Sequence, residues 1–334
     1  MHAKEVMRRA DVAALWDSFA YNAGFIVVKP TNISIRLYRM IKNMTSKSAG
    51  TDDQQALNRA INILRQQKSG VNTTVLNKQR FLSGKEYFEA GPQRRWFAPN
   101  GGEKCDRKKV ENCAVVVHNN WIVSKASKVY RFREHVMWMH DGVDQYYTSS
   151  SRLYLTYTNQ LPTLSHDDGL SKNEQQAITE SEISALKTAM TIGHLLNRTV
   201  ILPRFHSGSK AIESPLNSVL HVKSFDSDFA GQYRENSFLG HPKVPPDVNS
   251  GLSVQQLSWH IDKRSNSTTN RRNTTTVSDT DIIRQFGDVK DRVLRLESLH
   301  GVNIVLGNSN ENDVFTKKLR RAFYHSDYRQ YKRW

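Results

Sequence analysis

Three polar side chains follow an apolar run in the first half of the sequence. Residues 114–117 read Ala-Val-Val-Val, which is typical of a buried strand. His118, Asn119 and Asn120 come directly afterwards, and an imidazole with two amides can hold a metal ion or hydrogen-bond a ligand. A histidine at a strand end is more often a structural residue, so sequence chemistry alone favours that role for His118.

Asn22 and Gly24 stand at the entry of another predicted strand. This strand covers residues 23–30, and Pro30 ends it because proline cannot donate to a central ladder. On the pattern alone the two entry residues shape the strand. Further strands are predicted within residues 71–82 and 114–123, and a basic helix over residues 127–139.

A helix with a clear start is predicted after residue 50. Thr51 and Gln54 have capping-box spacing, and Asp52 and Asp53 favour the positive N-terminal end of a helix. One apolar stripe follows, made of Ala56, Leu57, Ala60, Ile61 and Leu64. This pattern by itself gives Asp53 and Gln54 the role of helix-start residues.

The Ser-rich stretch at residues 141–151 is the predicted domain boundary. Beyond it the pattern is strand, helix and strand, which predicts a parallel sheet and an α/β domain over residues 152–334. The predicted elements are a strand at 152–159, a helix at 181–197, a strand at 198–203, and a helix followed by a strand within 281–302. Residues 262–278 have no apolar periodicity and are expected to form an exposed polar insertion.

The chain has 334 residues and a formal net charge of +16. Such a charge invites a nucleic-acid interpretation, but Lys and Arg are spread along the chain, with one concentration at residues 317–334 and no recognisable RNA-binding motif. A basic surface that meets anionic substrates is favoured over nucleic-acid binding. No run of eighteen apolar residues occurs.

Cys105 and Cys113 are too few for a disulfide scaffold and have no neighbouring zinc ligands. They are free thiols if the protein is cytosolic, or a possible disulfide in an oxidising compartment. N-glycosylation sequons favour the second case and begin at Asn32, Asn43, Asn72, Asn197, Asn266 and Asn273. Asn197 is the least expected to carry a glycan because it lies between a helix and a core strand, whereas Asn266 and Asn273 lie in the polar insertion.

Three stretches carry a family resemblance. They are N-A-G-F-I-V-V-K-P-T at residues 22–31, D-Q at Asp53 and Gln54, and V-H-N-N-W-I-V-S-K-A-S-K at residues 117–128. In this order they resemble the nucleotide-diphospho-sugar transferase domain of glycosyltransferase family 77, with the spacing of its C-terminal half. The resemblance implies an incomplete GT-A-like domain at residues 1–145, followed by a second, Rossmann-like α/β domain.

The resemblance also implies roles for particular residues. His118 is expected to bind a divalent metal, Mn²⁺ by family resemblance, which neutralises the leaving diphosphate. Lys128 suits a phosphate as a point charge. The positions expected beside donor or acceptor are Asn22, Gly24, Asp53, Gln54, Asn120 and Lys128.

Two departures bear on activity. Ser124 stands where the family usually has glycine, and its side chain could crowd a close approach to the diphosphate. The family's Asp-x-Asp motif, which lies before the N-A-G-F segment, is missing, so we expect the chain to lack the N-terminal half of the domain together with any membrane anchor. The two Asp-x-Asp matches lie elsewhere: residues 226–228 are expected in a solvated turn and residues 279–281 at a helix start.

Residues 185–205 resemble the early helix-to-strand unit of O-fucosyltransferase-like folds. Arg204 and His206 follow the second strand, where a parallel sheet presents ligand contacts, although ordinary loop roles are favoured.

The leading hypothesis is a glycosyltransferase-like protein of the Golgi or endoplasmic reticulum lumen, with a nucleotide-sugar donor and a glycan or glycoprotein acceptor. It is expected to meet the membrane only through an absent N-terminal anchor. The catalytic residues are not readable from the sequence. The alternative is a non-catalytic carbohydrate- or partner-binding protein derived from such an enzyme.

Overall fold

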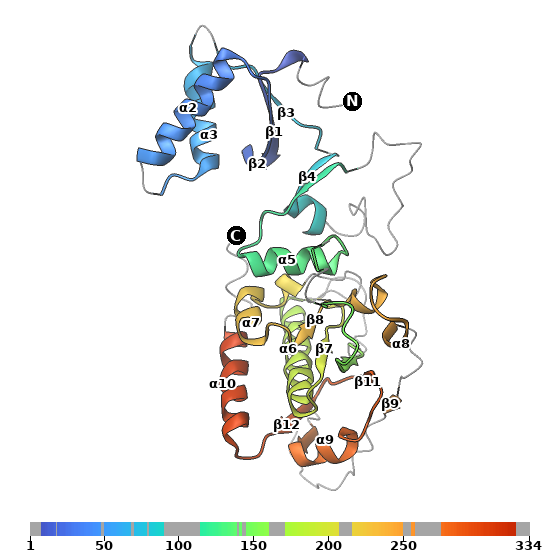
Figure 1. The fold of residues 1–334 in the computed structure, drawn as a ribbon. Coiled ribbons are helices and arrows are strands. Elements are labelled where there is room, and N and C mark those ends of the chain that lie inside the picture. Colours follow the sequence, from blue (N-terminus) through green and yellow to red (C-terminus); the bar gives the residue numbers. More distant parts are fainter. Residues whose placement is uncertain are drawn as a thin grey trace. The chain divides into compact units, whose positions relative to one another are not determined.

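The computed structural model of the chain describes residues 8–17, 19–47, 50–67, 70–78, 80–89, 114–138, 140–141, 145–159, 171–206, 216–249, 255–257 and 275–324. The chain divides into two units, Met1–Ile122 and Val123–Trp334 (Figure 1). The division falls before the stretch at 141–151 that the sequence suggests. The reason is that the basic helix α5 (Lys125–Glu134) packs against α7 (Val222–Phe229) of the second unit.

The first unit is built on a small mixed sheet. Strand β1 (Val12–Asp17) pairs antiparallel with β2 (Ala20–Val28) and parallel with β3 (Thr73–Val75). A second pair joins β4 (Phe81–Ser83) to β5 (Val116–His118) in parallel, and a π-helical turn (Lys85–Glu89) follows β4. Strand β1 was not predicted, although its apolar run is fully buried from Val12 to Leu15.

Two helices pack beside this sheet. Helices α2 (Asn32–Lys47) and α3 (Asp53–Arg65) lie side by side next to β1 and β2 (Figure 1). The predicted apolar stripe of α3 is confirmed, since all five of its residues are buried. The predicted capping box is wrong: the N-cap is Asp52, whose carboxylate accepts from the Gln55 backbone N–H at 2.7 Å, so Thr51 lies outside the helix.

Residues 114–117 were predicted to form a buried strand, and the prediction of burial is wrong. Strand β5 has only three residues, all half-buried, and Val115 is 56% exposed. The reason is that, among the strands the structure describes, β5 pairs only with β4, in a two-stranded sheet. The buried residue of this segment is Asn119.

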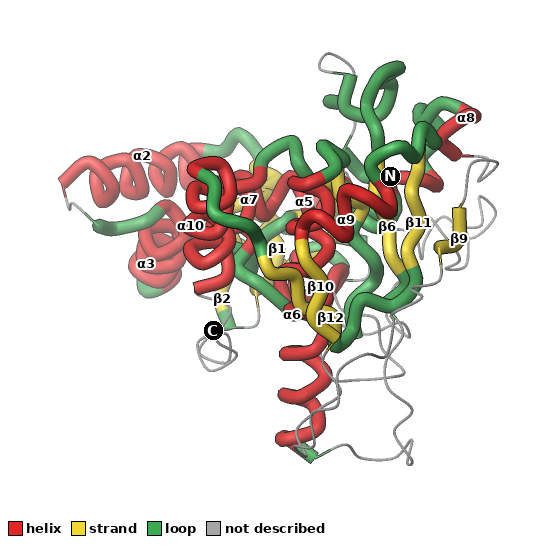
Figure 2. The backbone as a smooth tube through the Cα atoms, turned by 90° about the horizontal axis from the view of Figure 1, so that it is seen from below, coloured by secondary structure: helices red, strands yellow, loops and turns green. Residues whose placement is uncertain are grey.

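The second unit contains the predicted parallel sheet. Its five strands are β6 (Tyr154–Tyr157), β7 (Thr199–Ile201), β8 (Tyr233–Arg234), β9 (Gln255–Leu257) and β11 (Val293–Leu296). They lie in the order β8-β7-β6-β11-β9, and every neighbouring pair is parallel. Figure 2 shows β6, β11 and β9 side by side.

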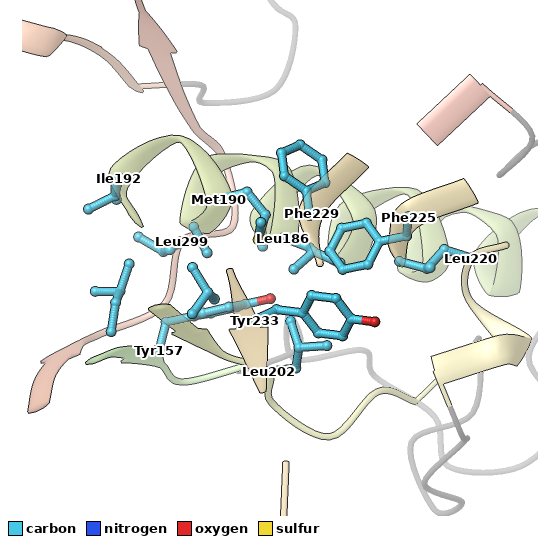
Figure 3. Close-up of a cluster of buried hydrophobic side chains, with 14 of the residues drawn as sticks. Tyr157, Leu186, Met190, Ile192, Leu202, Leu220, Phe225, Phe229, Tyr233 and Leu299 are labelled. Atoms are coloured by element: carbon cyan, nitrogen blue, oxygen red, sulfur yellow. The ribbon is translucent and has the colours of Figure 1, made fainter. Parts of the chain in front are cut away.

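Helices surround this sheet. They are α6 (Lys172–Leu195), α7, α8 (Pro246–Asn249), α9 (Asp279–Phe286) and α10 (Asn310–Tyr324), with short 3₁₀ turns at Leu216–Ser218 and Phe238–Gly240. Figure 3 shows part of the core, where Leu186 and Met190 of α6 pack with Tyr157, Phe229 and Leu299. The predicted strand-helix-strand unit β6-α6-β7 is thereby confirmed.

Two features differ from the sequence interpretation. Asp226 and Asp228 lie in helix α7 rather than in a solvated turn, and Asp228 is buried and paired with Arg321. Within the polar insertion, residues 262–274 lie outside the described residues, but its last residues form β10 (Thr275–Ser278), which pairs parallel with β12 (Val302–Val305). The helix start at residues 279–281 is confirmed by a capping box between Ser278 and Asp281.

Within the described residues, none of the helices has the length and apolar character needed to cross a bilayer.

Candidate functional site

A buried carboxylate organises the carboxyl end of β1. Asp17 is 7% exposed, and its Oδ1 accepts a hydrogen bond from the indole Nε1 of Trp121 at 2.6 Å. Its Oδ2 accepts from the side-chain amides of Asn22 at 3.0 Å and Asn120 at 3.2 Å. A buried carboxylate is stable only when such donors satisfy it. Asp17 therefore ties the end of β1 to the start of β2 and to the loop after β5.

The N-A-G-F motif forms an irregular bulge in β2. Leu15 pairs with Asn22, but the preceding residue Ala14 pairs with Ile26, so residues 23–25 have no partners in β1. The side-chain Oδ1 of Asn22 accepts from the Gly24 backbone N–H at 2.7 Å and holds the bulge. Bulges of this kind redirect a strand and its side chains.

Gly24 lies directly against the imidazole of His118. A Cβ built on Gly24 would stand 2.1 Å from Cε1 and 2.2 Å from Nε2 of His118. No side chain other than hydrogen leaves room for the ring there. The bulge therefore brings together Asn22, Gly24, His118 and Asn120, four residues predicted from separate stretches of the sequence.

The loop after β5 completes the cluster. Asn120 Oδ1 accepts from the backbone N–H of Gly84 at 2.7 Å, which joins this loop to the turn after β4. The indole of Trp121 is 37% exposed, and the ammonium of Lys85 lies 5.0 Å from its ring centroid. Trp121 has φ 57°, a rare backbone conformation for a bulky residue that is common at binding sites.

Asp53 and Gln54 lie at the exposed start of α3. Asp53 accepts from the Gln54 backbone N–H at 2.9 Å, which is a helix-start contact. The contact from α3 to the cluster comes from Asn58. Its Nδ2 donates to the Tyr21 carbonyl at 2.7 Å and its Oδ1 accepts from the Tyr21 N–H at 3.0 Å, beside Asn22.

Sequence reasoning missed Asp17, Asn58 and Trp121. The signal for Asp17 was an acidic residue directly after the apolar run of β1. Asn58 is a polar residue within the apolar stripe of α3, one turn after Gln54. Trp121 was part of the quoted motif, but its indole N–H carries no sequence signal for a partner.

Lys128 and Ser124 belong to the second unit. Ser124 is the N-cap of α5, where its hydroxyl accepts from the Ser127 N–H at 3.2 Å, and it has φ 87° and ψ 153°. That backbone region is essentially restricted to glycine, which explains why a glycine suits this position in the family that the sequence resembles. Lys128 lies on the exposed side of the same helix.

The side chains of the cluster meet only part of what a metal site requires. An imidazole is a good ligand for Mn²⁺, and His118 supplies one. Both oxygens of Asp17 already accept N–H donors. Across the described ranges, no three His, Cys, Asp or Glu side chains are grouped as a metal site would need.

The predicted modification sites have different surroundings. Asn32 and Asn43 lie on α2 and are exposed, and Asn72 is exposed before β3. Asn197 is exposed with φ 50° directly after α6. The predicted disulfide partners Cys105 and Cys113 and the sequons at Asn266 and Asn273 lie outside the described residues.

Comparison with known proteins gives one family. Residues 3–132 match the family described as nucleotide-diphospho-sugar transferase. The match lies in the N-terminal part of the chain; it does not assign these residues to the C-terminal half of that domain, and it names neither glycosyltransferase family 77 nor an O-fucosyltransferase-like region. No curated protein and no solved structure matches the chain. The mixed α/β fold of the first unit and the matched family together support a glycosyltransferase-like domain, followed by a second α/β region.

Proposed function

We propose that the first unit binds a nucleotide-diphospho-sugar at the cluster around Asp17 and takes part in transfer of its sugar to a glycan or glycoprotein. The observation that carries the proposal is the contact of Gly24 with the His118 imidazole. It places two residues of the matched region 94 positions apart in direct contact at a strand end. A strand end held by buried hydrogen bonds is a rigid frame for a ligand site.

Some residues of the cluster position their neighbours, and others are placed to contact the ligand. Asp17 acts as a positioning residue because its three hydrogen bonds fix Asn22, Asn120 and Trp121. His118 presents its ring at the bulge, and Lys85 adds a positive charge beside Trp121. A lysine ammonium binds a diphosphate as a point charge.

A divalent metal is part of this proposal through His118. When bound, Mn²⁺ would neutralise the charge that develops on the leaving diphosphate. His118 is the residue of the cluster that would hold such an ion. Asp17 is left out of the ligand set because its oxygens already accept N–H donors.

A non-catalytic role is the second candidate. It is favoured by the same observation on Asp17, since the carboxylate of the cluster accepts three N–H groups and is thereby occupied as a general base. In that case the cluster would bind a nucleotide-sugar or a glycan without transferring the sugar.

The site of action is proposed to be the Golgi or endoplasmic reticulum lumen. The observation in its favour is that the sequon asparagines Asn32, Asn43 and Asn72 are exposed and thus accessible to glycosylation.

The test is sugar transfer by the purified chain. UDP- and GDP-sugars carrying an isotope label are incubated with a panel of oligosaccharide acceptors and Mn²⁺, and products are read by mass spectrometry. A labelled product that disappears in Gly24→Ala and persists in Gly240→Ala supports the transferase. Gly240 is a matched control because a Cβ there meets nothing within 4 Å. Binding of the donor without product supports the non-catalytic candidate, and neither binding nor product refutes both.

A further inference from the structure

The amino edge of the parallel sheet in the second unit borders a cavity. Arg152 shortly precedes β6, Arg198 directly precedes β7 and Gln232 directly precedes β8. Since neighbouring strands are parallel, these residues meet at one edge, where they line a cavity of about 160 Å³ beside α6. Parallel sheets usually bind ligands at the opposite, carboxyl edge. There His206, which follows β7, donates its backbone N–H to the buried Glu182 at 2.8 Å, so that donor is already used.

The cavity at the amino edge is positively charged. Two arginines line it, and none of the described residues that line it is acidic. Arg198 is 5% exposed, and its guanidinium donates to the backbone carbonyls of Tyr154, Val289 and Asp291 at 3.1, 2.6 and 2.9 Å. These acceptors are neutral, and the carboxylate of Asp291, whose charge acts on Arg198, does not line the cavity. Because a buried cation favours a nearby negative charge, this cavity favours an anion.

Arg152 presents a pair of unused donors. Its Nη1 donates to Oγ1 of Thr199 at 3.1 Å and to the Gly231 carbonyl at 2.9 Å, which fixes the plane of the guanidinium. The Nε–H and Nη2–H groups have no acceptor among the residues that the structure describes. Two such N–H groups on one side of a guanidinium form parallel hydrogen bonds with two oxygens of a carboxylate or a phosphate.

Neutral donors lie beside the two arginines. The side-chain amides of Asn197 and Gln232 line the same cavity, are exposed, and bond to no other described residue. Burial lowers the pKa of His194, which also lines the cavity, so its ring adds no charge near pH 7. One guanidinium can satisfy both oxygens of a carboxylate, whereas a phosphate group offers three acceptor oxygens. The extra donors therefore suit a phosphate better than a carboxylate.

A neighbouring cavity has room for the rest of a ligand. His194 and Gln232 line this cavity too, and it measures about 260 Å³. Phe315 of α10 forms part of its wall and stacks on the His194 ring with 4.2 Å between the ring centroids. Glu311 and Lys318 contribute one charge of each sign, so this second cavity has no preference for an anion. Aromatic side chains combined with a few polar groups are typical of sites for small organic ligands.

We propose that the cavity at Arg152 binds the phosphate group of a small ligand, and that the sugar or nucleoside attached to this phosphate occupies the neighbouring cavity beside α10. Arg152 and Arg198 supply the positive charge, and the paired N–H groups of Arg152 bind two phosphate oxygens. The ligand is either a sugar phosphate or a nucleotide, since both join a phosphate to a ring. This site is separate from the cluster around Asp17 in the first unit, and it does not depend on sugar transfer there.

The test is a ³¹P NMR titration of the full chain with inorganic phosphate, glucose 1-phosphate and uridine 5′-monophosphate. At least one ester should bind more tightly than inorganic phosphate, and the tighter ester identifies the source of the phosphate. Equal affinity for all three probes would overturn the role of the neighbouring cavity. Absence of binding by every probe would overturn the whole proposal.

Three variants measure the donors. Arg152→Ala should weaken binding of the ester by about tenfold to a hundredfold, because two charge-assisted hydrogen bonds are lost. Arg152→Lys keeps the charge but not the paired donors, so its affinity should lie between those of the Ala variant and the unchanged chain. Gln232→Ala removes an exposed amide that holds no other described residue, and it should weaken binding by about threefold to tenfold.

Controls separate this site from general charge, from the first unit and from misfolding. Arg295→Ala removes an exposed arginine of β11 that lines neither cavity, and it should leave the affinity unchanged. Thermal melts of all variants show that they fold. If Arg295→Ala weakened binding as much as Arg152→Ala, the anion would be attracted by the overall charge alone and the proposal would be wrong. Binding that is lost in Gly24→Ala and kept in Arg152→Ala would also overturn it, because the ester would then bind in the first unit.

Discussion

Asp17 in the first unit and Glu182 in the second are both buried carboxylates that accept several hydrogen bonds, and they are supported differently. Asp17 accepts from side chains that belong to a bulge and a loop, and its partner Trp121 is partly exposed. Glu182 lies on a long helix packed against a five-stranded parallel sheet, and it is fully buried. The first arrangement organises irregular backbone, whereas the second rests on regular elements. Two carboxylates that accept a similar number of hydrogen bonds can therefore contribute differently to the stability of the fold.

The largest effect should come from removing the two carboxylates. Glu182→Ala leaves the half-buried donors of Asn159 and His206 without their acceptor and should lower the free energy of unfolding by about 3 kcal/mol. Asp17→Ala should cost about 1–2 kcal/mol, because water can reach the partly exposed Trp121 and Asn120. Urea denaturation measures both. If the Asp17 variant were less stable than the Glu182 variant, the predicted order of the two effects would be wrong.

The next effect concerns function rather than stability. In Gly24→Ala the new methyl group meets the His118 ring, so either the ring or the bulge must move. We expect donor turnover or donor affinity to fall by about a hundredfold, as for other displacements of about 1 Å at a site. The melting temperature should change little, since Gly24 is exposed. If Gly24→Ala bound the donor as well as the Gly240→Ala control does, the contact between Gly24 and His118 would not be needed for donor binding.

How much of this was readable from the sequence differs between the units. The β6-α6-β7 unit follows from strong periodicity and was predicted, because its apolar residues face a regular sheet. The candidate residues of the first unit were predicted from motifs, but their geometry was not, since a bulge of three residues has no periodic signal. Asp17 was missed because a hydrogen-bonded carboxylate looks in sequence like any polar residue at a strand end. The pairing of Asp228 with Arg321 was missed because the two lie far apart in the chain.

A smaller effect tests the strained helix start of α5. Ser124 and Ser171 are both N-cap serines, but Ser124 has φ 87° whereas Ser171 has φ −62°. Ser124→Gly should therefore raise the free energy of unfolding by about 1 kcal/mol, because the relief of backbone strain exceeds the loss of a cap. Ser171→Gly should lower it by a few tenths of a kcal/mol. Denaturant titrations measure both free energies of unfolding. Equal changes in the two variants would contradict the proposal that the backbone at Ser124 is strained.

The smallest effect is a pH dependence in the second unit. Burial lowers the pKa of His300 below its ordinary value of 6.5, so the folded state binds fewer protons than the unfolded state. The contribution of His300 to stability is present above pH 6.5 and is lost as the pH falls toward the folded pKa. His194 and His241 are shifted in the same direction by burial. His300→Gln should make the acid side of the stability profile shallower, and an unchanged profile would show that His300 does not contribute.

The central claim is that the cluster around Asp17 binds a nucleotide-diphospho-sugar, and calorimetric titration tests it most directly. The chain is titrated with UDP- and GDP-sugars with and without Mn²⁺, beside His118→Ala and the exposed-histidine control His140→Ala. The account predicts metal-dependent binding of at least one donor that is lost in His118→Ala and kept in His140→Ala. No binding to a folded chain, or binding that is the same in both variants, would contradict it and leave His118 as a structural residue of β5.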